Sequence, residues 1–447
     1  MPTESPQALP AATLAPNAPI GVGLLGCGTV GTGVARLLLD EAHAYAHRVG
    51  RPIELVRIGV RHPARDRGLP AELFTDDLAA VVADPRVHIV VEALGGVEPA
   101  LPLLMEAIAR GKHVVTANKE VIARHGHTIF PAARARGVAV HIEATVAGGI
   151  PIVAAMKSNL AANRIQQVAG IINGTTNYIL TAMTQQGHSL EAALAEAQRL
   201  GYAEADPTAD VEAYDAAYKI AILASIFFDH RVAIEEVHRE GILNLTAADI
   251  AYARELGYVV KLLGVARRDP GPNGEVLQVR VHPALIPAQH PLAPIDGVMN
   301  AVAVRGAAVG EVMFSGPGAG MFPTASAILG DVLAIAAHPE RPDRLMTCLH
   351  DGLGHVSPVA DLYTQFYVRL LAQDQPGVIG TIGTACGRHG ISIRSMVQKG
   401  ERDGCAEIVL VTHRVQEAAM RRALEEMAAH PSVHRIGSVI RVEDLAA

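Results

Sequence analysis

The segment IGVGLLGCGTVG, residues 20–31, decides the fold of the N-terminal part of this 447-residue chain. Its first six residues form the short apolar run of a buried strand, and the GxGxxG pattern over 26–31 leads into a helical pattern over 34–39. In a strand–turn–helix unit these glycines permit a tight turn and a close approach of the backbone to a pyrophosphate. We therefore expect a dinucleotide to contact five residues of the turn, although a Gly-rich turn without a ligand is the alternative: Gly26, Gly28, Thr29, Val30 and Gly31.

Strands and helices alternate after this segment and then give way to other patterns. Further strands are expected over 54–60, 87–92 and 113–116, which predicts a Rossmann-type, doubly wound parallel sheet of the α/β class. After Pro151 a strand over 164–172, helices over 177–186, 190–200 and 207–228 and a strand-rich stretch over 258–305 predict an α+β domain. The glycines of 316–320 open an apolar helix over 325–337, which indicates that the chain returns to the first domain.

The C-terminal part has the element order βαββαβ between 366 and 442, which predicts a ferredoxin-like domain. The sequence therefore divides into five predicted parts. They are a flexible tail over 1–17, a nucleotide-binding domain over 18–150 plus about 306–340, a substrate-binding and dimerisation domain over 151–305, a linker over 341–361 and a regulatory domain over 362–447.

Composition and charge exclude several classes of function. The net charge is −7 and no run of Lys or Arg occurs, so a small-molecule partner is favoured over nucleic acid or a membrane surface. The longest apolar run of the helical middle, 220–228, is far shorter than the ~20 residues of a membrane span. The N-terminus lacks a signal pattern and the four cysteines form no CxxC pair, which together predict a reducing, cytoplasmic location.

The end of the second strand bears on cofactor choice. An acidic residue at this place would bind the ribose hydroxyls of NAD, whereas this chain has Arg61, with Arg65 and Arg67 close behind. Cations there favour the 2′-phosphate of NADP. The alternative is that these arginines lie on a solvated loop, and use of NAD stays open.

Two lysines and one small-residue segment are candidates for chemistry. Lys119 follows a strand at the edge where doubly wound sheets bind ligands, although an exposed lysine is the alternative. Asp215 and Lys219 share a helical face beside the apolar run, so Lys219 is either a partly desolvated proton donor or half of an ordinary ion pair. The carbonyls of 143–151 suit a hard monovalent cation, and a plain bend is equally compatible.

Several of these segments together resemble the homoserine dehydrogenase family, in order and spacing, across most of the chain. They are GLLGCGTVG, TANKE, EATVAGGIPI, NGTTNYIL, LGYAEADPTADVEAYDAAYKIAILA and GPGAGMFPTASAILGD. The resemblance implies NAD(P)-linked interconversion of L-aspartate 4-semialdehyde and L-homoserine. It implies Lys219 as general acid/base, Lys119 as a second lysine that also contacts the cofactor, and Glu204 as the ligand of the substrate ammonium group.

The same resemblance implies further binding residues. Around the substrate these are Asp210, Asp215, Gly174, Thr175 and Tyr202. Gly318 would join Arg61 and the glycine turn at the cofactor, and a structural sodium ion would be held by Glu143, Val146, Gly148 and Ile150.

The C-terminal βαββαβ unit resembles an ACT domain. In such domains the first loop and helix bind an amino acid, which here implies Asp374, Gly377, Ile379, Gly390 and Ile391. The resulting hypothesis is feedback inhibition by L-threonine in threonine, methionine and isoleucine biosynthesis, in a homodimer or homotetramer. A purely oligomerising module is the alternative.

Two rival functions fit the sequence less well. An aldehyde dehydrogenase that forms a thioester needs a positioned cysteine, yet Cys27 lies in the cofactor turn and Cys386 and Cys405 lie in the regulatory module. A non-catalytic sensor of nucleotide and amino acid would lack the lysines and carboxylates described above. We therefore expect an enzyme.

Overall fold

A computed structural model describes residues 18–271, 274–340, 356–402 and 404–445 of the chain. The predicted tail over 1–17 and most of the predicted linker, 341–355, lie outside these residues. The described chain divides into two compact units. Unit 1 is assigned residues 1–166, 221–234 and 304–354, and unit 2 is assigned residues 167–220, 235–303 and 355–447.

Unit 1 is built on a parallel sheet of six strands in the order β3-β2-β1-β4-β5-β6. This order, with the direction reversing beside β1, is that of a doubly wound dinucleotide-binding sheet, so the predicted fold class is confirmed. The strands of this sheet are β1 (Ile20–Leu25), β2 (Ile53–Gly59), β3 (Phe74–Thr75), β4 (Val87–Glu92), β5 (His113–Thr116) and β6 (Val140–His141). Unit 1 also contains β12 (Gly310–Pro317), which lies outside this sheet. Its helices are α1 (Thr29–Asp40), α2 (Ala42–Val49), α3 (Leu78–Ala83), α4 (Ala100–Ala109), α5 (Lys119–Arg136), α6 (Ile152–Lys157) and α12 (Met321–Ala337).

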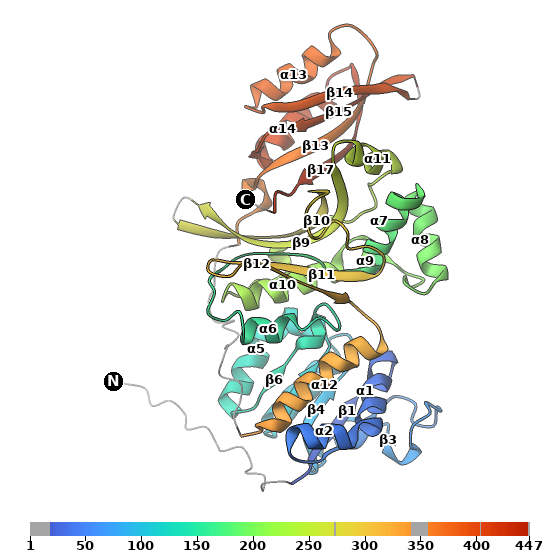
Figure 1. The fold of residues 1–447 in the computed structure, drawn as a ribbon, viewed down its shortest axis with the longest axis vertical. Coiled ribbons are helices and arrows are strands. Elements are labelled where there is room, and N and C mark those ends of the chain that lie inside the picture. The colour runs from blue at the N-terminus through green and yellow to red at the C-terminus, as the bar shows by residue number, and fades with distance from the viewer. Residues whose placement is uncertain (1–17, 272–273, 341–355, 403, 446–447) are drawn as a thin grey trace. The chain divides into compact units, whose positions relative to one another are not determined.

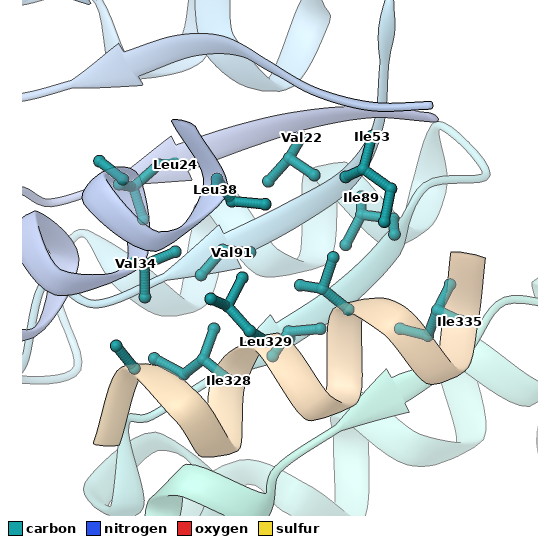
Figure 2. Packing of buried hydrophobic residues seen from close by; sticks show 14 of the residues in the cluster. Val22, Leu24, Val34, Leu38, Ile53, Ile89, Val91, Ile328, Leu329 and Ile335 are labelled. Atoms are coloured by element: carbon teal, nitrogen blue, oxygen red, sulfur yellow. The ribbon is translucent and has the colours of Figure 1, made fainter. Parts of the chain in front are cut away.

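The core of unit 1 joins the beginning of the chain to a helix that follows almost 300 residues later. Helix α12 runs alongside α1 in Figure 1. Figure 2 shows Ile328 and Leu329 of α12 pointing toward Val34 of α1 and toward Val91 on the sheet. Burial of a Leu or Ile side chain contributes about 1.5–3 kcal/mol, so α12 stabilises the strand and helix that carry the glycine turn.

Unit 2 contains one sheet that runs from the middle of the chain to its C-terminus. Its strands have the order β11-β7-β9-β10-β17-β13-β15-β14, and the short β8 and β16 pair with β10 and β13. The strands of this sheet are β7 (Ile165–Ile171), β8 (His238–Arg239), β9 (Tyr258–Gly271), β10 (Gly274–Pro287), β11 (Met299–Gly306), β13 (Tyr363–Ala372), β14 (Ile393–Arg402), β15 (Cys405–Thr412), β16 (Val415–Gln416) and β17 (Val433–Val442). The helices are α7 (Gly174–Gln186), α8 (Leu190–Arg199), α9 (Thr208–Val211), α11 (Ala247–Glu255), α13 (Val378–Arg388) and α14 (Glu417–Ala428), and α10 (Tyr214–Phe227) runs on into unit 1.

The prediction of one continuous helix over 207–228 was wrong. The helical segment ends after α9 and resumes at Tyr214, because the buried Ala213 has a left-handed backbone with φ +64°. A non-glycine residue in this region cannot continue a right-handed helix. The break reorients the chain between Asp210 and Asp215, and this matters for the site described below.

The C-terminal module has the predicted order β13-α13-β14-β15-α14-β17, with β16 as a two-residue addition. Alternate residues of β13 face in opposite directions. Phe366, Val368 and Leu370 pack with α13 and α14, whereas Arg369 points to the other side and binds Asp249 of α11. The predicted ferredoxin-like module is therefore confirmed, and its second sheet face is covered by a helix from the preceding domain.

Candidate active site

The glycine turn of unit 1 is shaped by the absence of side chains. Gly26 has φ +94°, and a Cβ added to it would lie 2.5 Å from the carbonyl oxygen of Ala93. A Cβ on Gly31 would lie 2.1 Å from the carbonyl oxygen of Gly26, whereas one on Gly28 would meet nothing within 4 Å. Gly28 is the N-cap of α1, and no side chain caps that helix. Open space before the N–H groups of Thr29 and Val30 suits a pyrophosphate.

Arginines follow β2 as the sequence predicts, but they differ in their surroundings. Arg61 is exposed in the bend after the strand. Arg67 is held against the glycine turn, since its Nε donates to the carbonyl of Cys27 at 3.3 Å and its guanidinium lies 5.2 Å from the ring centre of Phe74. Its Nη1 also donates to the carbonyls of His62 and Arg65. Arg67 therefore fixes the shape of the loop, whereas the side chains of Arg61 and Arg65 are exposed.

A buried carboxylate organises the strand ends beside this turn. Glu92, at the end of β4, is fully buried and accepts hydrogen bonds from the Thr116 hydroxyl at 2.5 Å and from the N–H of Leu94 at 2.7 Å. Asn118 reaches both Glu92 and the carbonyl of Gly96, and its Oδ1 caps α5. The half-buried Lys119 is the first residue of that helix. Sequence reasoning missed Glu92, although a carboxylate ending an apolar strand was visible.

The predicted cation segment forms a sharp bend in unit 1. Ala147 and Gly148 both have left-handed backbones, with φ +57° and +56°. A Cβ on Gly148 would lie 2.5 Å from the carbonyl carbon and oxygen of Gly318, so two residues predicted separately form one backbone contact. The carbonyl of Ile150 already accepts from the N–H of Ile152 at 2.8 Å. Several carbonyls of this buried bend thus already accept hydrogen bonds within it, as those of Glu143 and Ala147 also do from Val146 and Ile150.

The Glu143 side chain supports this bend rather than pointing to an ion. Its carboxylate accepts from the N–H groups of Val153 at 2.8 Å and Ala154 at 2.6 Å, at the start of α6. Burial and the charge of Asp331 raise the pKa of Glu143 to about 7. Any contribution of Glu143 to a cation site would therefore come through its carbonyl.

Lys219 lies at the centre of a hydrogen-bonded cluster in unit 2. Its ammonium group donates to Asp215 at 2.7 Å and to the carbonyl of Ile172, the residue after β7, at 2.9 Å. Both side chains of the pair are largely buried, at 13% and 11% exposure. The expected pairing of Asp215 with Lys219 is confirmed, and the additional carbonyl partner distinguishes it from a solvated helical ion pair.

Asn173 connects this pair to Asp210, and sequence reasoning did not assign it to the site. Its Nδ2 donates to Asp210 at 2.6 Å and to Asp215 at 2.9 Å, while its Oδ1 caps α7. Burial raises the pKa of Asp210, the hydrogen bond from Asn173 opposes this, and the charge of Asp215 adds to the increase. Only the break at Ala213 allows both carboxylates to face one amide, and that break has no obvious signal in the sequence.

The other predicted substrate residues lie on the elements around the cluster. A Cβ on Gly174 would lie 2.8 Å from the carbonyl of Val298, and the Thr175 hydroxyl donates to the carbonyl of Tyr202 at 2.7 Å. Tyr202 is exposed, with its ring 5.0 Å from that of Tyr178. The Glu204 side chain is also exposed, and its carbonyl accepts from Gln198. Glu204 is therefore near the cluster in sequence but not part of its hydrogen bonds in the described residues.

The predicted regulatory residues gather around the first helix of the C-terminal module. Gly377 caps α13 with φ +97°, and it lines a cavity of about 370 Å³ between α13 and α14. Ile379 is 52% exposed, and Asp374 accepts from Gln398 at 3.3 Å. Gly390 has φ +70° and precedes the buried Ile391 at the end of the same helix.

Other classes of site find little support among the described residues. No group of three or more His, Cys, Asp or Glu residues in that part of the chain is placed to hold a metal ion. Cys27 and Cys386 are buried, and Cys348 lies outside the described ranges. Within those ranges, no helix combines the length and the apolar character that crossing a membrane requires.

Three family models match the chain. The model described as homoserine dehydrogenase matches residues 151–333, the homoserine dehydrogenase NAD-binding domain matches 26–143, and the ACT domain matches 366–431. The chain is 51% identical over 431 residues to a homoserine dehydrogenase of Synechocystis sp., covering 95% of this chain and 99% of the relative.

Solved structures agree with these matches. A homoserine dehydrogenase from Thiobacillus denitrificans has a TM-score of 0.90 at 45% identity, covering 96% of this chain and 99% of that chain. A hyperthermophilic archaeal homoserine dehydrogenase in complex with NADPH has a TM-score of 0.61 at 26% identity, covering 73% of this chain and 99% of that chain.

Proposed function

The chain belongs to the homoserine dehydrogenase family of NAD(P)-dependent oxidoreductases, and on that premise we propose the roles of its own residues. The reaction is the reversible, NAD(P)H-dependent reduction of L-aspartate 4-semialdehyde to L-homoserine. Lys219 is the general acid that protonates the aldehyde oxygen and the general base that removes the proton in reverse. The observation that carries this role is the buried Lys219 ammonium, oriented by Asp215 and by the carbonyl of Ile172.

The geometry around Lys219 suits proton transfer. Two of its three N–H donors bind acceptors in the described residues, which leaves the third for a substrate oxygen. Reduction of an aldehyde develops negative charge on that oxygen, and a fixed cation stabilises the charge most where water is excluded. Asp215 keeps the cation in place, and Asn173 bridges Asp215 and Asp210 by donating to both carboxylates. The exposed Glu204, which precedes Asp210 by six residues, is proposed to bind the substrate ammonium group.

The nucleotide is proposed to bind at the glycine turn of unit 1. When bound there, a nicotinamide cofactor supplies or takes up the hydride. The open space at Gly28, the uncapped start of α1 and the backbone N–H groups of Thr29 and Val30 fit its pyrophosphate. Arg61 is proposed to bind a 2′-phosphate and so to favour NADP, with NAD as a second substrate, and Lys119 and Gly318 complete the cofactor site.

The test of the catalytic role is Lys219→Ala. We expect kcat to fall about 1,000-fold, as for the loss of a general acid/base, while NADPH binding measured by fluorescence is unchanged. The matched control is Lys399→Ala. Lys399 lies in β14 of the C-terminal module and pairs with Glu255 of α11. A Lys219→Ala enzyme with near-normal kcat would contradict the assignment.

A structural sodium ion is proposed at the bend of Glu143, Val146, Gly148 and Ile150. Support comes from the two successive left-handed residues, which turn backbone carbonyls away from the regular hydrogen-bonding pattern. Hard monovalent cations prefer such oxygen ligands. The thermal midpoint should be higher in sodium chloride than in choline chloride at equal ionic strength, and equal midpoints would remove the proposal.

The C-terminal module is proposed to bind L-threonine and to inhibit the enzyme, which would place it in threonine, methionine and isoleucine biosynthesis in the cytoplasm. The exposed Ile379 beside the left-handed Gly377 supports a ligand or a second copy of the module at this loop, in a homodimer or homotetramer. Calorimetry with threonine, paired with initial rates, tests the proposal. Absence of both affinity and inhibition would leave the module an oligomerising role only.

A further inference from the structure

Arg441 joins two modules of unit 2 through two carboxylates. Its buried guanidinium donates to both oxygens of Glu240 at 2.8 Å, and to both oxygens of Glu417 at 2.7 and 2.8 Å. Arg441 lies in β17 and Glu417 is the first residue of α14, so both belong to the C-terminal module. Glu240 follows β8 in the preceding domain. The planar guanidinium thus fixes the position of Glu240 relative to α14 in two directions.

The sheet places these residues side by side. The strands β8 and β17 both pair in parallel with β10, at Arg280–Val281 and Ala284–Leu285 respectively. The N–H of Glu240 then donates to the carbonyl of Val281 at 2.8 Å. His238 also binds the Glu240 carboxylate, at 2.8 Å. Glu240 is therefore held by its own sheet and by the C-terminal module together.

The residues next to Glu240 are packed against the end of α9 and the loop that joins it to α10. The N–H of Ile242 donates to the carbonyl of Val211 at 2.8 Å. A Cβ on Gly241 would lie 2.2 Å from that same carbonyl oxygen, so the two backbones are in direct contact. On the other side of Glu240, Arg239 donates to the carbonyl of Glu212, and its guanidinium lies 3.4 Å from the ring centre of Tyr214.

The end of α9 carries Asp210, which belongs to the Lys219 cluster. Asp210 immediately precedes Val211 and accepts from Asn173, which in turn binds Asp215. We propose that Glu240 and Arg441 are positioning residues, through which the C-terminal module sets the place of Asp210 and hence the orientation of Lys219. The proposal rests on the proposed role of Lys219 in catalysis.

The contact between Arg441, Glu240 and Glu417 depends on charge, so a single substitution should weaken it. Burial would raise the pKa of Glu417, yet the hydrogen bonds and charge of Arg441 lower it below its ordinary value. Removing Arg441 would take two hydrogen bonds from the buried Glu417 carboxylate and leave it paired with Arg421, so that variant would also weaken the packing of α14. Glu240 is the better position to change, because its side chain is 37% exposed and Arg441 keeps Glu417 as a partner.

The test is Glu240→Gln in the full-length enzyme. It keeps the size of the side chain and one oxygen acceptor but removes the charge-assisted bidentate pair. We expect kcat to fall about tenfold, KM for homoserine to change less than twofold, and the thermal midpoint to fall by only a few degrees. Glu240→Asp, which restores the charge, should recover most of kcat.

A double-mutant cycle separates positioning from general weakening. If Glu240 acts through Asp210, Glu240→Gln should cost little kcat in an Asp210→Asn background, so that the two effects do not add. The control is Tyr252→Phe, which removes a 2.6 Å hydrogen bond from α11 to Glu407 of the C-terminal module, away from the loop. Its kcat should equal that of the wild type.

The outcomes distinguish this inference from the proposed function. A normal kcat for Glu240→Gln, or fully additive effects with Asp210→Asn, would overturn the positioning role while Lys219→Ala remains inactive. A Tyr252→Phe enzyme as slow as Glu240→Gln would also overturn it, because any loosened module contact would then suffice. An active Lys219→Ala enzyme would instead contradict the proposed function itself.

Discussion

The glycine turn of unit 1 and the Lys219 cluster of unit 2 are built in opposite ways. The turn is defined by what is missing, since Cβ atoms at Gly26 and Gly31 would overlap backbone oxygens. The cluster is defined by side chains that share hydrogen bonds, with Asn173 between two carboxylates and Lys219 on one of them. A steric site tolerates no added atom, whereas a polar site tolerates changes of shape better than changes of charge or hydrogen bonding.

This difference also explains how each site can fail. An added methyl group in the turn must move backbone, and that displaces the strand and helix whose core is shown in Figure 2. A lost amide in the cluster removes the cap of α7, at a cost of about 1 kcal/mol, but it forces no backbone to move and leaves the two carboxylates without a shared donor. The predictions below test this contrast, beginning with the largest effect.

Among the variants that test this contrast, Gly31→Ala should have the largest effect. Its Cβ would lie 2.1 Å from the carbonyl oxygen of Gly26, closer than any contact that side chains tolerate, so the turn must open. We expect NADPH affinity to fall more than about 100-fold, together with a lower thermal midpoint. Gly330→Ala is the matched control, because a Cβ on this residue of α12 would meet nothing within 4 Å and Gly330 is outside the proposed cofactor site. Equal losses in the two variants would contradict a steric origin.

Asn173→Ala should act on chemistry rather than on the cofactor. Without the amide, Asp210 and Asp215 repel each other and Asp215 no longer holds Lys219 in one orientation. We expect kcat to fall about 100-fold, within the range for loss of general acid–base catalysis, with NADPH affinity unchanged. Steady-state kinetics and fluorescence titration measure both. A loss of NADPH affinity as large as that of kcat would contradict the separation of the two sites.

His113 of unit 1 gives a prediction about the pH dependence of stability, which involves neither the glycine turn nor the Lys219 cluster directly. Unit 1 keeps this histidine neutral, since burial and the charge of His141 lower its pKa from 6.5 to about 4. The unfolded chain therefore binds more protons between these values, and the stabilisation present above pH 6.5 is lost as pH falls toward 4. Between pH 7 and pH 5 the free energy of unfolding should fall by about 2 kcal/mol from this group.

Urea unfolding at the two pH values measures this loss. His113→Gln removes the titration while a side-chain oxygen remains to accept from the N–H of Ala139, which now donates to Nδ1 at 3.0 Å. The variant should therefore show a weaker decline of stability between pH 7 and pH 5. An unchanged decline would show that other groups dominate it.

The two sites also differ in how far the sequence predicts them. The glycine turn is local, so its position, its strand and its helix follow from residues 20–39. The Lys219 cluster depends on long-range contacts: Asn173 meets Asp210 and Asp215 only because Ala213 takes a left-handed backbone, and a continuous helix was predicted there instead. Spacing of four residues predicted the Asp215–Lys219 pair, because that contact lies within one helical turn.

Arg61→Ser should have the smallest effect. It removes a charge at the edge of the glycine turn, so it tests whether charge as well as shape matters at that site. Arg61 is exposed after β2, whereas Arg67 is occupied by the carbonyl of Cys27, so we expect Arg61 to contribute to the proposed preference for a 2′-phosphate. We expect kcat/KM with NADPH to fall about tenfold, the value of one exposed charge-assisted contact, and that with NADH to stay within twofold. Arg86→Ser is the matched control, since this exposed arginine precedes β4 at the opposite end of the parallel sheet and pairs with Asp84. If Arg61→Ser lowers kcat/KM with NADPH and with NADH equally, the arginine supports the shape of the loop and does not bind the 2′-phosphate. The edge of the turn would then depend on shape, as its centre does.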